Sequence, residues 1–345
     1  NVELIVPKRR NHIKDDVFTY YHTRNNFTLR YLKFIDFFSW SWLHHKIGFT
    51  LNILEFLLLT LFLKIDKQNI IYTRSPEIAW LFGARGYKTF YECHQLPEKK
   101  STLFNFFIKK CGGITTSSYG MKVDLLKYVQ SYPENQILVA PNGIDSDIFL
   151  NDAVDKIQAK KKLGLPLNKN IILYTGHLYE WKGVDTLAQA ANFLDKENLI
   201  YFVGGTDSDR IDFQKKYPSK NIITVPFQNR IKIALWLKAA DVLVLPNIPN
   251  SALSERHTSP IKMFEYMASG TPIIASNLPS LKEILKTETS FFFQAGDVNS
   301  LINALKKVLI NKNVAGKKAQ KAKQDALRYT WKQRSLAISN HLLIN

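Results

Sequence analysis

Short apolar runs alternate with longer amphipathic segments along nearly the whole chain. In its first half, the apolar runs predict β-strands at Val2–Val6, Ile70–Thr73, Thr89–Tyr91, Gly113–Thr116 and Ile137–Ala140. Helical spacing of apolar positions predicts helices between these strands, among others at Leu51–Leu63 and Lys122–Tyr132. Alternation of strands with helices is typical of βαβ units, which assemble into parallel sheets.

A second series of the same kind fills the other half of the chain. Its predicted strands are Ile171–Thr175, Ile200–Val203, Ile222–Val225, Val242–Leu245, Pro272–Ala275 and Ser290–Phe293. Its predicted helices include Thr186–Leu194, Ile231–Ala240, Leu301–Ile310 and Lys317–Lys323. We therefore expect an α/β fold in which two Rossmann-like parallel-sheet domains face each other. Because open parallel sheets bind ligands beyond the carboxyl ends of their strands, the cleft between the domains is the expected active site.

A polar region marks the boundary between the two expected domains. A turn at Pro141-Asn142-Gly143 leads into the charged stretch 145–162, which indicates a linker. We therefore predict domains at residues 1–152 and 153–328, followed by a final helix at 329–345. The first predicted strand has the character of the second strand of such a domain. We expect that the usual first strand, loop and helix are missing before it.

The composition is that of a globular protein, with 345 residues of which 46% are hydrophobic. Cys93 and Cys111 lie far apart without metal-ligand spacing, so we expect two idle thiols in a reducing compartment. The most apolar segment, Gly48–Leu63, is interrupted by Asn52 and Glu55, and it is shorter than the roughly 20 residues of a transmembrane helix. Because the sequence also opens without a signal-peptide pattern, we expect a cytoplasmic protein.

The formal net charge of +18 points to an anionic partner. Nucleic acid, an anionic membrane surface and a phosphate-bearing substrate are all compatible with it. The segment Val17–Lys46 interleaves aromatic side chains with Arg and Lys. Such a segment can stack on single-stranded nucleic acid, can lie on a membrane interface, or can be ordinary core with a basic rim. The charge alone leaves these alternatives open.

The stretch Thr258–Ser276 carries the strongest chemical signal. Ser259 is predicted to cap a helix, Pro260 fits its first turn because that position needs no backbone N–H, and Gly270 ends it. A helix start with free N–H groups and a positive dipole end favours an anion, usually a phosphate. Glu265, about a turn and a half inside the helix, can accept hydrogen bonds from a ribose diol. A phosphate beside a ribose predicts a nucleotide site.

Two other predicted strand ends carry residues that suit the same ligand. One strand closes on Gly176 and His177, and Lys182 just before the next helix can neutralise a diphosphate. Another ends at Tyr91-Glu92-Cys93-His94, which places His94 at a carboxyl edge where it can hydrogen-bond a sugar hydroxyl. Each residue also fits a simpler alternative, a surface lysine or a structural histidine at an ordinary strand end. The sequence has no zinc-ligand spacing, no Walker pattern and no GxSxG elbow.

Together these motifs resemble glycosyltransferase family 4, whose members are retaining enzymes with the GT-B fold. The motifs, in order, are Glu92-x-His94, Pro141-Asn142-Gly143-Ile144-Asp145, Gly176-His177-Leu178, Trp181-Lys182-Gly183, Ala240–Pro246, Ser259-Pro260-Ile261-Lys262, Glu265–Pro272 and Trp331. Each motif alone is weak, but the ordered set covers nearly the whole chain. The resemblance implies a GT-B fold whose C-terminal helix crosses back to the first domain.

The resemblance also implies roles for the site residues. The donor site would comprise Gly176, His177, Lys182, Ser259, Pro260, Ile261, Lys262 and Glu265. Lys182 would neutralise the donor diphosphate, and Glu265 would bind the ribose. His94 and Glu265 would be the catalytic residues, with His94 reaching the transferred sugar. No metal and no cofactor besides the nucleotide sugar is implied, because cationic side chains and a helix dipole can stabilise the leaving diphosphate.

Two positions depart from the family's pattern. The first of its two usual glutamates falls at His257, and Glu255 is nearby but out of register, so both are additional candidate site residues. Many members carry a phosphate-binding arginine where this chain has His177. Base recognition, which often uses backbone groups, is expected around Val225–Asn229.

The expected activity is transfer of a hexose or N-acetylhexosamine from a nucleotide sugar to a surface glycan or lipid-linked acceptor. A lipid-linked acceptor explains the aromatic and basic segment better than nucleic acid does. We therefore expect peripheral attachment at the inner face of the cell membrane and no nucleic-acid partner. One alternative is a nucleotide-sugar 2-epimerase or hydrolase of the same fold, which would consume the donor without an acceptor. The other is a basic nucleic-acid-binding protein, whose RNA binding would depend steeply on salt.

Overall fold

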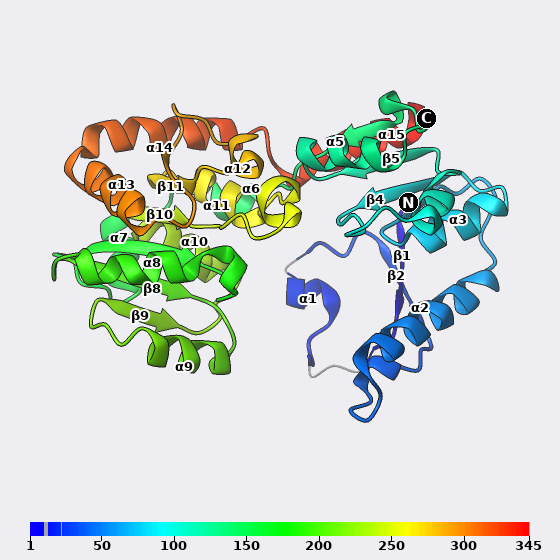
Figure 1. Cartoon of the computed structure of the whole chain (residues 1–345), viewed down its shortest axis with the longest axis horizontal. Helices are drawn as coiled ribbons and strands as arrows, with labels where there is room; N and C mark the ends of the chain where they lie inside the picture. The colour runs from blue at the N-terminus through cyan, green and yellow to red at the C-terminus, as the bar shows by residue number, and fades with distance from the viewer. Residues whose placement is uncertain (10–12, 22, 345) are drawn as a thin grey trace. The chain divides into compact units, whose positions relative to one another are not determined.

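A computed structural model of the chain describes residues 1–9, 13–21 and 23–344. These residues form two compact units (Figure 1). Unit 1 comprises Asn1–Tyr91 and Thr102–Gly112, and unit 2 comprises Glu92–Ser101 and Gly113–Asn345. Each unit is described by itself below.

Unit 1 is built from parallel strand pairs and helices. Strands β1 (Glu3–Pro7) and β2 (Thr28–Leu32) pair in parallel, and so do β3 (Ile71–Thr73) and β4 (Thr89–Cys93), whose last two residues fall in unit 2. Its helices are α1 (Val17–Tyr21), the short η1 (Phe37–Ser39), α2 (His45–Leu61), α3 (Pro76–Ala84) and α4 (Thr102–Ile108). Helix α3 packs against α2 and α4. Within the described residues, no helix has the length and apolar content needed to cross a membrane.

Unit 2 begins with a parallel pair of strands, β5 (Gly113–Thr116) and β6 (Ile137–Val139). Helix α5 (Tyr119–Tyr128) and the turn η2 (Glu134–Gln136) connect them. The last helix of the chain, α15 (Trp331–Ile344), packs on β5. The Arg334 guanidinium on α15 donates to the Glu92 carboxylate at 2.7 Å and to the Ala140 carbonyl at 3.2 Å. The end of the chain is thus tied to residues 92–140.

The rest of unit 2 surrounds a six-stranded parallel sheet in the order β12-β11-β10-β7-β8-β9. The strands are β7 (Asn170–Thr175), β8 (Asn198–Val203), β9 (Ile222–Val225), β10 (Val242–Leu245), β11 (Ile273–Ser276) and β12 (Phe291–Phe293). The chain adds strands outward from β7 in one direction and then, starting at β10, in the other. In such sheets the ligand crevice opens between the two central strands, here β7 and β10, at their carboxyl ends.

Helices cover both faces of this sheet (Figure 1). They are α8 (Val184–Ala190), η4 (Ala191–Phe193), α9 (Asp207–Lys216), α10 (Arg230–Ala239), α11 (Ile261–Ser269), α12 (Pro279–Lys282), α13 (Val298–Ile310) and α14 (Lys312–Ala326). On one face, Leu173 and Leu243 pack with Trp236 of α10 and Met267 of α11. On the other face, alternate strand residues such as Ile172 pack with α8 and α13. Because both faces are buried, the strands are almost purely apolar, which made them easy to predict.

Every strand expected from the sequence is present, within two residues at either end. Strand β2, by contrast, was not predicted, because its aromatic and basic residues suggested a surface patch. The stretch predicted as a linker contains the helices α6 (Ser146–Phe149) and α7 (Lys156–Lys162). Helix α7 packs against α10, and its buried Lys160 ammonium lies 2.9 Å from the Asp241 carboxylate. A lysine that reads as solvated in the sequence is therefore part of the packed interior.

Candidate active site

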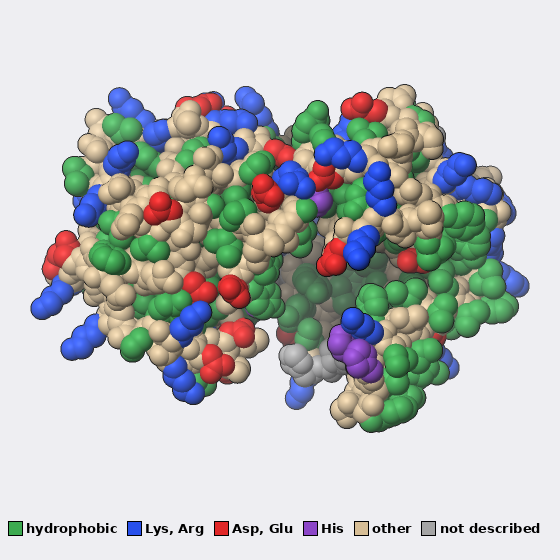
Figure 2. Space-filling view, in the orientation of Figure 1, with side chains coloured by type: hydrophobic (Ala, Val, Ile, Leu, Met, Phe, Trp, Pro, Cys, Tyr) green, Lys and Arg blue, Asp and Glu red, His purple; other side chains and the backbone are tan. Residues whose placement is uncertain are grey.

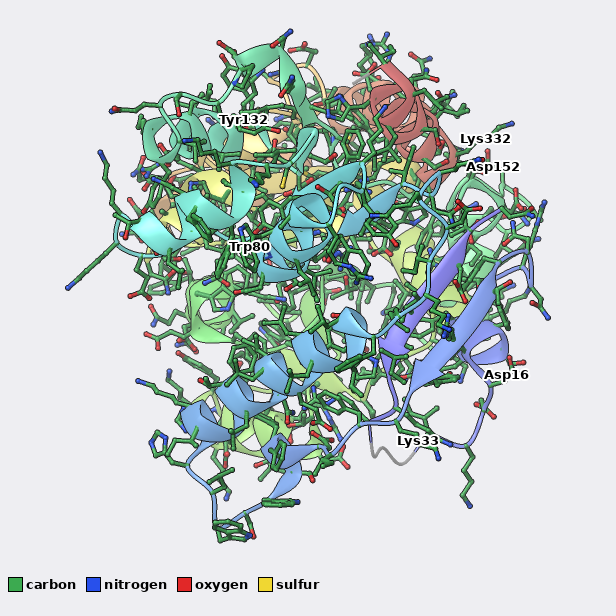
Figure 3. All side chains as sticks on the ribbon, turned by 90° about the vertical axis from the view of Figure 1, so that its right-hand side faces the viewer. Asp16, Lys33, Trp80, Tyr132, Asp152 and Lys332 are labelled. Carbon is green, nitrogen blue, oxygen red and sulfur yellow. The ribbon has the colours of Figure 1, made fainter. Side chains whose placement is uncertain are left out.

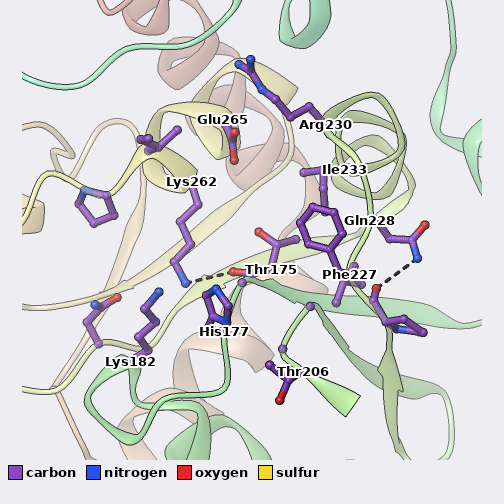
Figure 4. A pocket seen from close by; sticks show the side chains of 18 of the residues that line it. Thr175, His177, Lys182, Thr206, Phe227, Gln228, Arg230, Ile233, Lys262 and Glu265 are labelled. Atoms are coloured by element: carbon purple, nitrogen blue, oxygen red, sulfur yellow. Dashed lines mark hydrogen bonds between the residues drawn. The ribbon is translucent and has the colours of Figure 1, made fainter. Parts of the chain in front are cut away.

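A cavity of about 840 Å³ opens in unit 2 at the carboxyl ends of β7, β8 and β9 (Figure 4). It lies where the strand order of the sheet reverses, as expected for an open parallel sheet. Many of its lining residues follow strand ends, among them Gly176 after β7, Gly204 after β8, Pro226 after β9 and Asn247 after β10. Helices α10 and α11 supply the remaining wall with Arg230, Lys262 and Glu265.

Two glycines allow the backbone to form the floor of the cavity. Gly176 and Gly204 have φ angles of +121° and +125°, a region that other residues rarely adopt. A Cβ atom on Gly204 would lie 2.7 Å from the carbonyl oxygen of Gly176. The ends of β7 and β8 therefore approach each other closely only because no side chain stands between them, which leaves backbone exposed to a ligand.

Helix α11 presents an uncapped N-terminus to this cavity. Pro260 occupies the N-cap position, and no side chain accepts a hydrogen bond from the first turn. The prediction that Ser259 caps the helix was wrong, because the Ser259 hydroxyl accepts from the Asn142 backbone N–H at 3.2 Å. Pro260, Ile261 and Lys262 line the cavity, so the free N–H groups and the positive dipole end lie at its wall.

Lys262 and Lys182 bring two ammonium groups to the same side of the cavity (Figure 4). The Lys262 ammonium donates to the Thr175 carbonyl at 3.1 Å and lies 3.8 Å from the ring centre of Tyr174. Burial, reinforced by the charge of Lys182, lowers the pKa of Lys262 well below its ordinary value. Burial also lowers the pKa of Lys182. Within the described chain, no carboxylate lies at salt-bridge distance from either ammonium.

The loop that carries Lys182 is pressed against the end of β10. Gly183 adopts a left-handed conformation with φ +69°, and a Cβ atom there would lie 1.7 Å from the Pro246 carbonyl oxygen. Only glycine fits this contact. His177, which the resemblance placed on the diphosphate, lines the cavity with its ring stacked on Tyr179 at 4.9 Å.

Glu265 lies one turn beyond the start of α11, with its side chain in the cavity (Figure 4). Burial raises the pKa of Glu265 to about 7, and the nearby charges of Arg230 and Lys262 offset this only in part. The next residue, Tyr266, holds the helix to the sheet, since its hydroxyl accepts from the Thr175 N–H at 2.9 Å. The helix that carries Glu265 is thus fixed to the sheet, and the raised pKa leaves the Glu265 carboxyl partly protonated near pH 7.

Four of the residues proposed from the sequence do not line this cavity: Ser259, His94, His257 and Glu255. The His94 ring is 2.8 Å from the Glu92 carboxylate, which also binds Arg334. His257 ends the π-helical turn Leu253–His257, and its Nε2 lies 2.8 Å from the Asp124 carboxylate.

Around His257 a second cavity of about 430 Å³ is lined by His257, Asp124, Arg256 and Lys127, among others. Glu255 is ion-paired with Arg256 at 3.1 Å. The structure therefore brings together Gly176, His177, Lys182, Pro260, Ile261, Lys262 and Glu265 in the wall of one cavity.

Several lining residues were not identified from the sequence. Arg230 and Asn247 belong to no motif, and Gly204 and Gly205 follow a strand that gave no chemical signal. The segment Val225–Asn229, proposed for base recognition, does contribute Pro226, Phe227 and Gln228 to the cavity. Among the described residues, no group of three or more His, Cys, Asp or Glu side chains could hold a metal ion.

Comparison with protein families gives one match, to the family described as "Glycosyl transferases group 1", over residues 155–328. That span is half of the chain and contains the whole cavity. Among curated proteins, a D-inositol 3-phosphate glycosyltransferase of Xylanimonas cellulosilytica is 24% identical over 59% of this chain and 50% of its own. The UDP-Gal:alpha-D-GlcNAc-diphosphoundecaprenol alpha-1,3-galactosyltransferase of Escherichia coli is 30% identical over 51% and 46%. The chain thus spans about half the length of the curated relatives it matches.

Solved structures resemble the chain over more of its length. Anabaena HepE in complex with UDP superimposes with a TM-score of 0.72 at 13% identity, covering 92% of this chain and 86% of that protein. HepE in complex with UDP-glucose gives a TM-score of 0.66 at 15% identity, covering 80% and 79%. These likenesses confirm the expected fold, GT-B, a mixed α/β fold with parallel sheets in two domains.

Replacing Glu265 by Gln should stabilise the unliganded chain at high pH but not at low pH. The Glu265 pKa rises from its ordinary value of 4.5 to about 7 on folding, so the wild type loses stability as the pH rises from about 4.5 to about 7. Glu265→Gln cannot ionise and should gain on the wild type by roughly 1–3 kcal/mol between about pH 5 and about pH 8.5. Urea unfolding at the two pH values measures the difference.

The matched control is Glu180→Gln, a change at an exposed residue next to the same cavity. This variant should differ from the wild type by the same small amount at both pH values. If Glu265→Gln behaves like Glu180→Gln, the carboxyl of Glu265 is not held away from ionisation by its surroundings.

Proposed function

We propose that this chain, which belongs to the family of group 1 glycosyl transferases, transfers a hexose or N-acetylhexosamine from a nucleotide sugar to a glycan or lipid-linked acceptor. One observation carries the proposal: the ammonium groups of Lys182 and Lys262 share a cavity with the uncapped start of α11. A diphosphate supplies the negative charge that these groups lack, and it can accept hydrogen bonds from the remaining N–H groups of the two ammonium ions and of the helix start.

The nucleoside end of the donor has a place further along the cavity. Glu265 lies about one turn beyond Lys262 on α11, where its carboxylate can accept hydrogen bonds from the two ribose hydroxyls. Phe227, which lines the cavity after β9, is 76% exposed and offers its ring for stacking on a base. The complexes of HepE with UDP and UDP-glucose support a UDP-sugar as the donor.

The groups that bind the diphosphate can also stabilise it as a leaving group. As the bond between the sugar C1 and the diphosphate oxygen breaks, negative charge grows on the diphosphate beside Lys182 and Lys262. The acceptor hydroxyl forms the new bond to C1 from the same face and passes its proton to the departing phosphate oxygen. The anomeric configuration is then retained. The two lysines stabilise the charge of the leaving diphosphate, as a metal ion does in other enzymes. His94, oriented by Glu92, is our proposed contact to the transferred sugar.

An anionic membrane is the proposed partner of unit 1. Along α2, Ile47, Leu54, Leu58 and Leu61 recur at helical spacing, and each is more than 40% exposed. Figure 2 shows hydrophobic side chains gathered over α2 beside histidine and basic side chains, and Figure 3 shows α2 from another side.

The residues around this apolar stripe suit a lipid surface. Trp42 and Phe62, at the two ends of α2, are 76% and 79% exposed, and Trp42 stacks on Trp40 at 5.4 Å. The exposed Lys46 and Lys64 add positive charge next to them. Apolar and aromatic side chains with a basic rim match an anionic bilayer, and the named acceptor of the Escherichia coli relative is lipid-linked.

Turnover of UDP-sugars tests the proposed activity. The wild type should release UDP from one member of a panel of UDP-hexoses and UDP-N-acetylhexosamines, and release should depend on an undecaprenyl-diphosphate-linked glycan acceptor. Lys262→Met should weaken UDP binding roughly 10- to 100-fold, because a charge-assisted hydrogen bond is lost. Calorimetric titration with UDP measures the affinity.

A control variant and a measurement of stability accompany the UDP titration of Lys262→Met. Lys215→Met removes an exposed charge from the end of α9 and should leave UDP affinity within about twofold. Lys262→Met should not lower the unfolding midpoint, because it removes a charge that burial disfavours. Donor consumption that proceeds at the full rate without acceptor would indicate an epimerase or hydrolase instead.

Vesicle binding tests the membrane surface. The wild type should sediment with vesicles that contain phosphatidylglycerol at low salt, and the double variant Trp42→Ser/Phe62→Ser should bind at least about tenfold more weakly, because two interfacial side chains are lost. Phe193→Ser is the matched control, since Phe193 is 62% exposed but belongs to unit 2. Equal binding by all three proteins would remove α2 from the membrane contact.

A further inference from the structure

The side-chain oxygen of Asn247 is a buried hydrogen-bond acceptor without a partner among the described residues. Asn247 follows β10, lines the 840 Å³ cavity and is only 1% exposed. Throughout the described chain, no group donates a hydrogen bond to its Oδ1. An unsatisfied buried acceptor destabilises a protein, so its place in a cavity wall indicates a partner that arrives with the ligand.

The backbone fixes Asn247 next to the loop that carries Lys182. The Ile248 N–H donates to the Trp181 carbonyl at 3.3 Å, and the Ile248 carbonyl accepts from the Ser254 hydroxyl at 2.7 Å. On the other side of Asn247, Gly183 touches the Pro246 carbonyl so closely that no Cβ atom fits. Contacts on both sides hold the backbone of Asn247 in place, so its side chain stays at the cavity wall.

The chemistry of the cavity narrows the identity of the missing donor. The oxygens of a diphosphate are acceptors, so they cannot satisfy a second acceptor. Neither lysine ammonium donates to Asn247 Oδ1: that of Lys262 bonds the Thr175 carbonyl and lies over the Tyr174 ring, and that of Lys182 lies over the rings of Trp181 and Tyr179. A sugar hydroxyl, or the N–H of an N-acetyl group, is a donor that a nucleotide sugar brings next to its diphosphate.

We propose that Asn247 Oδ1 accepts a hydrogen bond from the transferred sugar, so that Asn247 distinguishes the nucleotide sugar from the nucleoside diphosphate. The proposal rests on the proposed function, because it takes a nucleotide sugar as the ligand. Asn247 thereby becomes a specificity-determining residue of the sugar subsite, while Lys182 and Lys262 bind the part that UDP and UDP-sugars share. A buried acceptor that a ligand leaves unpaired penalises that ligand, which is the physical basis of the discrimination.

The test compares UDP with the member of a UDP-sugar panel that binds the wild type most tightly. The panel is UDP-glucose, UDP-galactose, UDP-N-acetylglucosamine and UDP-N-acetylgalactosamine, and calorimetric titration gives the affinities. Asn247→Leu, similar in size but without an acceptor, should bind the UDP-sugar at least about tenfold more weakly and UDP within about twofold of the wild type. Its unliganded unfolding midpoint should equal or exceed that of the wild type, because the unpaired acceptor is gone.

Gln228→Leu is the matched control. Gln228 is another amide in the same cavity, and its Nε2 donates to the Pro226 carbonyl at 3.1 Å. This variant should change the affinities for UDP and UDP-sugar by the same factor.

Two results would overturn the proposal. Equal losses for UDP and UDP-sugar in Asn247→Leu would place the amide on the diphosphate, and unchanged affinities would mean that water satisfies Oδ1. A wild type that binds neither UDP nor any UDP-sugar would instead contradict the proposed function itself, so the two failures are distinguishable.

Discussion

The cavity at the end of β7 depends on two ammonium groups that the fold holds partly out of water without a carboxylate partner in the described chain. Lys262 is held by the Thr175 carbonyl and the Tyr174 ring, and Lys182 faces it from the loop fixed by Gly183. Like charges brought together in a partly buried site oppose folding. We infer that the repulsion between the two lysines is offset when an anion binds. The uncapped start of α11 places its positive dipole end on the same side of the cavity.

The polar groups of the cavity are electrostatically unsatisfied at three points, which match successive parts of one ligand. Among the residues that the structure describes, no carboxylate pairs with the two lysines and no group donates to Asn247 Oδ1, while burial disfavours the ionisation of Glu265. A nucleotide sugar supplies a diphosphate, a ribose diol and sugar hydroxyls in one connected molecule. Binding of the nucleotide sugar should therefore stabilise unit 2 strongly, because the ligand pairs these charges and this acceptor as well as forming other contacts.

The sequence identified those parts of the fold and site that local pattern controls. Apolar runs located the strands, and Pro260 and Gly270 located the two ends of α11. Both signals could be identified because they depend on residues that are neighbours in the chain. Contacts between distant residues could not be predicted. The Ser259 hydroxyl accepts a hydrogen bond from the Asn142 N–H instead of capping the helix. The Asp124 carboxylate contacts His257, which lies 133 residues further along the chain. Asn247 was missed because an unpaired acceptor becomes visible only when every neighbour is in place.

Proton uptake on binding UDP tests the central claim most directly. Between about pH 8 and about pH 10 the carboxyl of Glu265 and the phosphates of UDP are already ionised, whereas burial and the charge of Lys182 depress the pKa of Lys262. A bound diphosphate favours the ammonium form and raises that pKa. Calorimetric titration in two buffers of different ionisation enthalpy should therefore show protons taken up by the wild type and fewer taken up by Lys262→Met. Binding without proton uptake, or with proton release, would contradict the account.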